Sequence, residues 1–178
     1  MCTLTGDPAT SATAAPATAA PPAAAPCAAK APATTWAKSL QARVYARGGD
    51  SEVLVGCNRL SGRRTVLARW FSCECSIADE PDPQVWLAGR HVAVNQYFCP
   101  PDASPCRGTL RVFDLRTGGA LYGAATGTLI DLVIKPNGSI GYLVGRQLYR
   151  IDTRGPTLLD EGPGIDGGSL AWRGHHLD

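Results

Sequence analysis

The sequence predicts an all-β domain built from repeated four-stranded antiparallel sheets behind a disordered N-terminal arm. Three observations predict it. Short runs rich in valine and aromatic residues alternate with turns that contain glycine, and no convincing helix interrupts them. A strand-and-turn pattern recurs about every 40 residues, which indicates repeat architecture. The first 35 residues contain no such run and differ sharply in composition.

The arm covers residues 1–35 and holds 14 Ala, 7 Thr and 6 Pro. Its only charged residues are Asp7 and Lys30, and no aromatic residue precedes Trp36. Such a segment buries too little apolar surface to offset the entropy of ordering it. Its spaced prolines prevent a long helix. We therefore predict a disordered tether over 1–35 and a folded domain over 36–178.

The strands of the domain are expected between turn residues. The expected ranges are 43–46, 52–57, 64–70, 85–88, 91–98, 109–114, 120–122, 129–134, 140–144, 147–152, 157–159, 169–172 and 175–177. Pairs of these runs meet at glycine-containing turns, which is typical of hairpins. They group into an incomplete set of three strands, two full sets of four, and the start of another set.

Two equivalences between the sets give the period. Asp114 and Asp152 lie 38 residues apart, and each follows a leucine by four positions and precedes an arginine by two. Residues 86–91 resemble residues 170–175, which is a separation of 84, or two repeats of about 42. Four strands per repeat at this spacing indicate β-propeller blades. We expect the two aspartates to cap the backbone of their turns.

The turn Pro136-Asn137-Gly138 and the strand end Phe113-Asp114-Leu115-Arg116-Thr117-Gly118 resemble those of bacterial TolB-like and WD40-like β-propeller proteins. The resemblance covers about residues 42–178 and implies a propeller of antiparallel four-stranded blades. The Trp-Asp dipeptide and the Gly-His pair of true WD40 repeats are absent. Because a closed propeller needs about four blades, we expect a partial or truncated propeller with about three blades plus the start of a fourth. A β-sandwich of the same strands is the alternative.

The cysteines are the main candidates for covalent chemistry. Cys99 and Cys106 flank a proline-rich loop between two expected strands, which favours a disulfide between them. Cys57 is expected to reach Cys73 or Cys75 across a hairpin. A zinc site from Cys73, Cys75, Cys99 and Cys106 is an alternative, although Cys73 and Cys75 are closer in sequence than usual zinc ligands. Free thiols in a reducing compartment are a third.

Other motifs have structural explanations. Gly162 to Gly167 match G-x-G-x-x-G, but no helix is expected after them, so an ordinary loop is favoured over a nucleotide site. His91 follows a turn and is expected on a strand face, while His175 and His176 point to opposite faces of a strand. The acidic loop 79–82 lacks the alternating ligands of a calcium site. We therefore expect no catalytic residue, no bound metal and no cofactor.

Composition limits the partners. The net charge is +2 and the arginines are scattered, so we expect no nucleic-acid partner. No apolar stretch is long enough for a membrane span. The Ala/Pro/Thr tether favours a secreted or envelope protein, with the cytoplasm as the alternative. Exposed strand edges predict a protein partner or self-association.

The preferred function is a non-catalytic binding or scaffold module that uses the loops of a propeller-like scaffold. The alternative, which the resemblance implies, is a fragment of a propeller enzyme of the hydrolase, lactonase or dehydrogenase type. The three histidines offer little material for such an active site.

Overall fold

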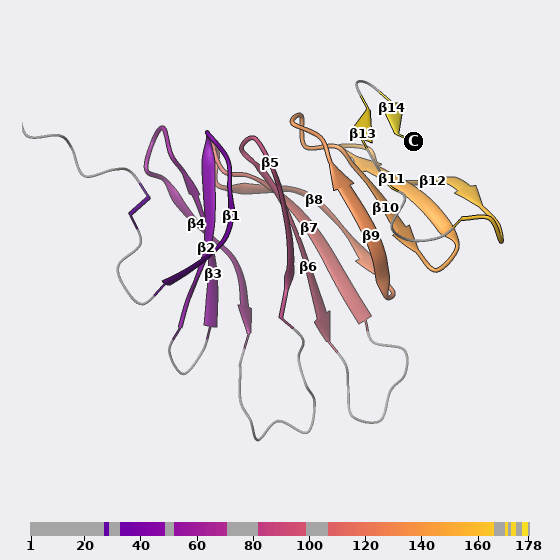
Figure 1. The fold of residues 1–178 in the computed structure, drawn as a ribbon, viewed down its shortest axis with the longest axis horizontal. Helices are drawn as coiled ribbons and strands as arrows, with labels where there is room; N and C mark the ends of the chain where they lie inside the picture. Colours follow the sequence, from indigo (N-terminus) through magenta and orange to yellow (C-terminus); the bar gives the residue numbers. More distant parts are fainter. Residues whose placement is uncertain are drawn as a thin grey trace, which may run out of the picture.

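The structure is a computed structural model that describes residues 27–28, 33–48, 52–70, 82–98, 107–165, 170, 172–173 and 176–177. Strands and short turns make up this part of the chain, and no helix occurs in it. The strands form three four-stranded antiparallel sheets and one two-stranded hairpin (Figure 1). The expected all-β class and the four-stranded antiparallel sheets are confirmed.

Sheet I contains the strands β1 to β4 in sequence order. Their bounds are β1 Ala33–Lys38, β2 Ala42–Arg47, β3 Glu52–Asn58 and β4 Arg64–Trp70. Each strand pairs antiparallel with the next, from Lys38 opposite Arg43 to Glu52 opposite Trp70. Sheet I is therefore a simple up-and-down meander.

Sheets II and III repeat this meander. Sheet II holds β5 Gln84–Ala88, β6 His91–Phe98, β7 Arg107–Asp114 and β8 Gly119–Thr126. Sheet III holds β9 Leu129–Ile134, β10 Ile140–Val144, β11 Gln147–Asp152 and β12 Gly155–Glu161. The hairpin of β13 Trp172–Arg173 and β14 His176–Leu177 follows sheet III.

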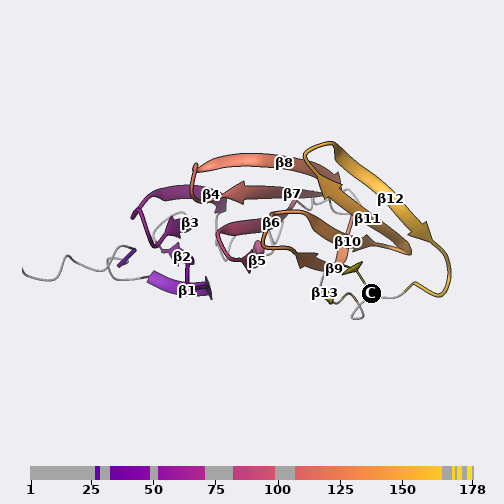
Figure 2. The same cartoon turned by 90° about the horizontal axis from the view of Figure 1, so that it is seen from above.

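The three sheets stand in a row in the order I, II, III. Seen from above, the first strands β1, β5 and β9 lie along one long side and the last strands β4, β8 and β12 along the other (Figure 2). The first strands of neighbouring sheets contact one another, β1 with β5 and β5 with β9. β8 and β12 make the corresponding contact on the other side. The contact between first strands therefore recurs at both boundaries between sheets.

Sheet II is packed on both faces, which explains the nearly continuous apolar sequence of β6. Val92 and Val94 point into a core shared with Leu54 and Trp70 of sheet I. Ala93, between them in sequence, points into a second core with Ile140 and Ile151 of sheet III. Side chains alternate between the faces of a strand, so a strand with a neighbour on each face needs apolar residues at every position.

The first sheet corrects the sequence analysis. A three-stranded first set was expected, and β1 supplies its fourth strand. The expected domain start at Trp36 falls inside β1, because the Thr-rich segment before it continues the pairing with β2. Trp36 holds the strand in place, since its ring lies 5.6 Å from the ring of Trp70 in the core. Tertiary packing therefore determines that this segment forms a strand, although its composition resembles that of the arm.

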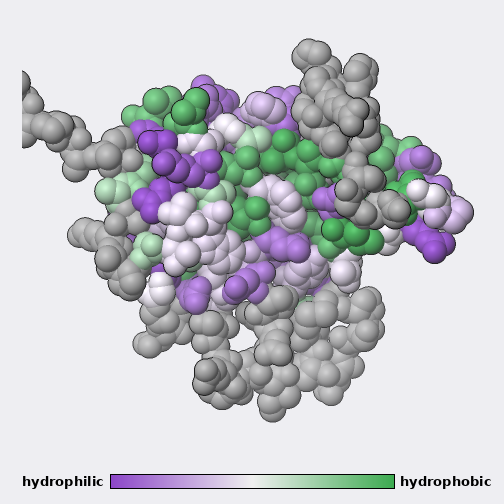
Figure 3. All heavy atoms as spheres, in the orientation of Figure 1, coloured by the Kyte–Doolittle hydropathy of each residue, from purple (hydrophilic) through white to green (hydrophobic). Residues whose placement is uncertain are grey.

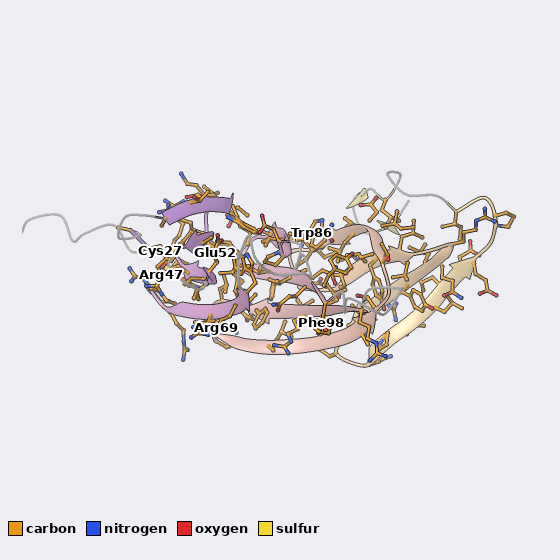
Figure 4. All side chains as sticks on the ribbon, turned by 90° about the horizontal axis from the view of Figure 1, so that it is seen from below. Cys27, Arg47, Glu52, Arg69, Trp86 and Phe98 are labelled. Atoms are coloured by element: carbon orange, nitrogen blue, oxygen red, sulfur yellow. A yellow bond between two sulfur atoms is a disulfide. The ribbon has the colours of Figure 1, made fainter. Side chains whose placement is uncertain are left out.

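The outer face of sheet I carries the disulfide Cys27–Cys57, with 5.7 Å between the Cα atoms. Arg43 donates from Nη1 to the carbonyl of Cys27 at 3.2 Å, and Arg64 donates from Nη2 to the carbonyl of Ala28 at 3.0 Å. Cys27, Tyr45, Val55 and Cys57 form a small buried cluster there. Figure 4 shows Cys27 beside sheet I at one end of the molecule, so this segment is attached to the outer face.

The pairing of Cys57 with Cys73 or Cys75 is therefore wrong. Cys57 lies near the turn between β3 and β4, where it is opposite Arg64. By contrast Trp70, the last residue of β4 before Cys73, is opposite Glu52 at the other end of the hairpin. Five residues of strand, about 17 Å, separate Glu52 from Cys57, and Cys73 and Cys75 themselves lie outside the described residues. A hairpin brings together residues at equal distances from its turn, a condition that this pair does not meet.

Candidate functional site: the turn face

Six turns gather at one end of the three sheets, and we call this end the turn face. They are residues 39–41, 59–63, 89–90, 115–118, 135–139 and 153–154, each of which links an odd-numbered strand to the next one. Contacts between sheets hold them together. The Ser39 hydroxyl donates to the carbonyl of Gly89 at 2.6 Å, and His91 Nδ1 lies 2.6 Å from the carbonyl oxygen of Pro136.

The turn face is basic. Its six turns contain Arg59, Arg63, Arg90, Arg116, Lys135 and Arg154, and no acidic residue. Figure 3 shows hydrophilic residues interspersed with hydrophobic ones along the upper edge over sheets I and II, and hydrophobic residues over the middle of the molecule. The overall net charge of +2 hides this arrangement, because the charge is unevenly placed. Clustered positive charge attracts anionic ligands and partners.

One turn design recurs in all three sheets at the end of the third strand. Asp114 Oδ1 accepts a hydrogen bond from the backbone N–H of Arg116 at 2.8 Å, and Asp152 Oδ1 accepts one from Arg154 at 2.9 Å. The expected equivalence of these aspartates and their capping role are confirmed. Asn58 is the third copy, since its Oδ1 accepts from the N–H of Leu60 at 2.9 Å and of Ser61 at 3.1 Å.

The sequence analysis missed Asn58 because the spacing differs. Asn58 and Asp114 are 56 residues apart, against 38 between Asp114 and Asp152. The chain segments after β4 and β6 are longer than those after β8 and β10 and account for nearly all of this difference. A fixed-period search therefore fails, although the turn itself is recognisable. Gly62 and Gly118 each donate to the carbonyl four residues earlier at 2.8 Å, in Asn58 and Asp114 respectively.

Asp114 differs from its two counterparts by its surroundings. Its side chain is only 6% exposed, and Oδ1 lies 3.1 Å from Arg90 Nε. Oδ2 lies 4.0 Å from Arg116 Nε and 3.9 Å from His91 Nε2. Asp152, in contrast, has one cationic neighbour, Arg150 at 3.3 Å, and is 26% exposed. Asp114 therefore positions two guanidinium groups, whereas Asp152 mainly caps its own turn.

A pocket of about 280 Å³ opens beside these two guanidinium groups where sheets I and II meet. Its lining combines the two arginines with polar groups of sheet I. The lining residues are Gln41, Asn58, Leu60, Ser61, Arg90 and Arg116. Arg116 is 65% exposed and Arg90 is 35% exposed, so both reach solvent from the wall of the pocket. We call this site the arginine pocket.

The Leu115 side chain explains why the pocket forms at this place. Leu115 follows the capping residue Asp114 and is fully buried against sheet I. A Cβ atom on Gly56 of β3 would lie 2.5 Å from a Leu115 methyl carbon, so the glycine makes room for the leucine. This contact fixes the Asp114 turn against sheet I. Arg116, which follows Leu115 in the sequence, and Arg90 are thereby brought to the Asn58 turn.

The opposite end of the sheets has a different character. Asn95 and Thr126 are buried there and bonded to each other, with 3.2 Å between Thr126 Oγ1 and Asn95 Oδ1. The Tyr97 hydroxyl accepts from the N–H of Leu129 at 2.8 Å, and burial raises the pKa of this tyrosine. Figure 4 places Phe98 and Arg69 toward the last strands and Trp86 toward the first strands. The contact of Tyr97 with Leu129 joins sheets II and III, whereas Asn95 and Thr126 are both in sheet II.

The remaining predicted residues fall into two groups. Cys73, Cys75, Cys99, Cys106 and His175 lie outside the described residues. Of the others, His91 is buried between sheets II and III with Pro136 and Asp114 as neighbours, which is the satisfied strand-face histidine that was expected. Residues 162–165 form a turn after β12, and within the described part of the chain no helix follows them.

Metal-binding clusters and membrane-spanning helices are both absent from the described residues. Among these residues no three histidine, cysteine or acidic side chains are grouped closely enough to hold a metal ion. Nor does that part of the chain form a helix of the length and apolarity that a lipid bilayer requires.

Comparison with known proteins adds no relative. No family model, no curated protein and no solved structure matches this chain.

Proposed function

We propose that this chain is a non-catalytic, propeller-like binding module that recognises an acidic segment of a partner protein through its turn face. In this proposal the three sheets serve as blades that hold six turns in one plane. The observation that carries the proposal is the composition of those turns, with six basic residues and no acidic one. Loops held by a rigid β scaffold are a common place for binding surfaces.

The charge distribution supports an anionic partner rather than an apolar one. The other end of the described sheets carries basic and acidic residues together, for example Arg47 beside Glu52 and Arg146 near Glu161. Within the described ranges, the turns of the turn face carry basic residues and no acidic ones, with Asp114 and Asp152 capping two of them from the strand ends. Such a surface steers an acidic partner before contact, and its effect weakens as salt is added.

A protein partner is favoured over a nucleic acid because of the disulfide Cys27–Cys57. Stable disulfides belong to oxidising compartments such as the cell envelope or the exterior. Nucleic acids are not the usual partners there. The proposal therefore includes a secreted or envelope location.

The two described acid–base residues beside the arginine pocket, His91 and Asp114, support a binding role more than an enzymatic one. His91 is 4% exposed, and its ring nitrogens face Pro136 and Asp114. Asp114 is similarly buried and is occupied by arginines and by its own turn. Neither group offers a solvent-accessible atom for a substrate.

The test compares two triple variants in binding to a fluorescein-labelled hexaglutamate peptide, measured by anisotropy at low salt. The first variant replaces Arg63, Arg116 and Arg154 of the turn face with Gln, and the control replaces Arg47, Arg107 and Arg146 at the other end. All six arginines are exposed. We expect the first variant to lose about tenfold or more in affinity and the control about twofold or less, because only the turn face gathers the charge.

Three results would contradict the proposal. Absence of peptide binding by the unaltered protein would rule out an acidic protein segment as the ligand. Equal losses in the two triple variants would show that total charge, not the turn face, drives binding. Tighter binding of a labelled oligothymidylate than of the peptide, at the same number of negative charges, would assign the face to nucleic acid instead.

A further inference from the structure

We propose that the arginine pocket binds a single carboxylate group and is the specific anchoring site for an acidic side chain of the partner. This inference rests on the proposed function, which concerns the turn face as a whole. It assigns recognition to one place on that face, where sheets I and II meet. The pocket is lined by Arg90, Arg116 and polar groups of the Asn58 turn.

The donors of the pocket suit an oxygen ligand. Asp114 engages Arg90 and Arg116 through their Nε atoms, at 3.1 Å and 4.0 Å. The Arg116 side chain is 65% exposed and that of Arg90 is 35% exposed, and both line the pocket, so their guanidinium groups are accessible to a ligand. A guanidinium group donates from several nitrogens in one plane, which matches the two oxygens of a carboxylate.

The polar side chains from sheet I complete the lining. Asn58 Oδ1 already accepts two backbone N–H groups of its own turn, which leaves the NH2 end of the amide as the group available to a ligand. Ser61 and Gln41 add a hydroxyl and an amide. Leu60 is 82% exposed at the same place and offers an apolar surface to the aliphatic part of a glutamate side chain.

The charge of the pocket remains positive despite Asp114. Two guanidinium groups face one carboxylate, and the nearby Arg59 and Arg63 add to the field. Asp114 therefore orients the arginines without cancelling their charge. The volume of about 280 Å³ is enough for one acidic side chain.

Sheet III provides a matched internal control. Arg154 occupies the same position in its turn as Arg116, two residues after the capping aspartate, and its N–H is capped in the same way. The side chain of Arg154 does not line the arginine pocket. Arg116→Gln and Arg154→Gln each remove one positive charge from the same face, so total charge cannot distinguish them. A difference in binding then measures the pocket.

The first measurement is the affinity of the two single variants for labelled hexaglutamate. Losing a charge-assisted hydrogen bond predicts a loss of about tenfold for Arg116→Gln and of about twofold or less for Arg154→Gln. Thermal unfolding of both variants checks that each remains folded. Equal losses would contradict the arginine pocket as the anchoring site. They would leave the proposed function of the turn face unchanged.

The second measurement uses a small ligand and does not depend on a protein partner. Glutarate is titrated into labelled protein while the Nε–Hε NMR signals of the arginines are followed, with inorganic phosphate in a parallel arm. The inference requires saturable shifts of the Arg90 and Arg116 signals with glutarate and none of the Arg154 signal. Uniform shifts of all arginines, or a stronger response to phosphate, would contradict a carboxylate site. If hexaglutamate does not bind but glutarate does, the protein-partner proposal fails and the pocket remains.

Discussion

Sheet II packs against a neighbour on each face, and the two contacts use different side chains. Toward sheet I, Leu115 is seated beside Gly56 in an apolar core with Val92 and Val94, and the side chains of Ser39 and Gln96 bond to the backbone at Gly89 and Arg69. Toward sheet III, side chains also bond to backbone, as His91 does to Pro136 and Tyr97 to Leu129. Repetition of one sheet design therefore does not repeat the surface between sheets. The Arg90 and Arg116 guanidinium groups beside Leu115 line a pocket only on the sheet I side.

The disulfide behind sheet I is expected to give the largest effect on stability. The loop closed by Cys27 and Cys57 spans 30 residues. Opening it by Cys27→Ala should lower the free energy of unfolding by about 3 kcal/mol, because the unfolded chain regains conformational freedom. Urea unfolding without reductant measures this. A loss below about 0.5 kcal/mol, or peptide mapping that finds Cys27 linked elsewhere, would contradict the clamped outer face.

Leu115 tests the apolar contact between sheets I and II. Leu115→Ala should cost about 3 kcal/mol, since it removes a fully buried side chain and leaves a cavity beside Gly56. Thr153 follows Asp152 as Leu115 follows Asp114, but it is exposed. Thr153→Ala should therefore stay within about 0.5 kcal/mol. Similar costs at the two positions would mean that the two turns have equivalent neighbours.

The capping aspartates test the same difference through charge. Asp152→Ala should cost about 1 kcal/mol, the usual value for a lost cap. Asp114→Ala should cost about 2 kcal/mol, because Arg90 Nε is buried without a hydrogen bond and would also lose the compensating carboxylate charge 3.1 Å away. Chemical denaturation of the two variants provides the comparison. A larger loss for Asp152→Ala would refute the special role of Asp114.

Alkaline pH tests the contact between sheets II and III. The Tyr122 hydroxyl donates to the carbonyl of Gly138, and burial, with a smaller contribution from Asp152, raises its pKa to about 12. A tyrosine in the unfolded chain loses its proton near pH 10. A rise in pH from about 10 to about 12 therefore stabilises the unfolded state relative to the folded state. The stabilisation of the folded state by the Tyr122 hydroxyl is complete below pH 10 and is lost as the pH rises toward 12.

In the Tyr122→Phe variant, the free energy of unfolding should therefore fall less steeply with pH in this range than it does in the unaltered protein. The flattening is partial, because burial also raises the pKa of Tyr97 and Tyr142. Fluorescence-monitored unfolding between pH 9 and pH 12 gives the slopes. Identical slopes for the two proteins would show that Tyr122 is not buried against sheet III.

The sequence predicted the local structure well because turns and alternation are local signals. Asp114 and Asp152 were recognised as equivalent caps, and their hydrogen bonds agree with this. β1 was missed because its Ala/Thr-rich sequence forms a strand only through pairing with β2 and packing of Trp36. Asn58 was missed because unequal loops break the period.

The candidate site was largely out of reach of the sequence. Arg90 and Arg116 are 26 residues apart, and the Asn58 turn belongs to another sheet. Their meeting depends on the seating of the Leu115 side chain against the backbone of Gly56, a contact between distant residues that no local pattern encodes. The basic character of the turn face appears when the turns are grouped by the end of the sheets at which they lie. The predicted strands already allow this grouping, so this part of the site was within reach of the sequence.

The most direct measurement is a map of amide chemical-shift changes on addition of hexaglutamate to the isotopically labelled protein. The account predicts the largest changes at Ser61, Arg90 and Arg116, smaller ones at the other turns of the turn face, and none at the opposite end of the sheets. Largest changes at Arg47, Arg107 and Arg146, or changes spread evenly over both ends, would contradict it.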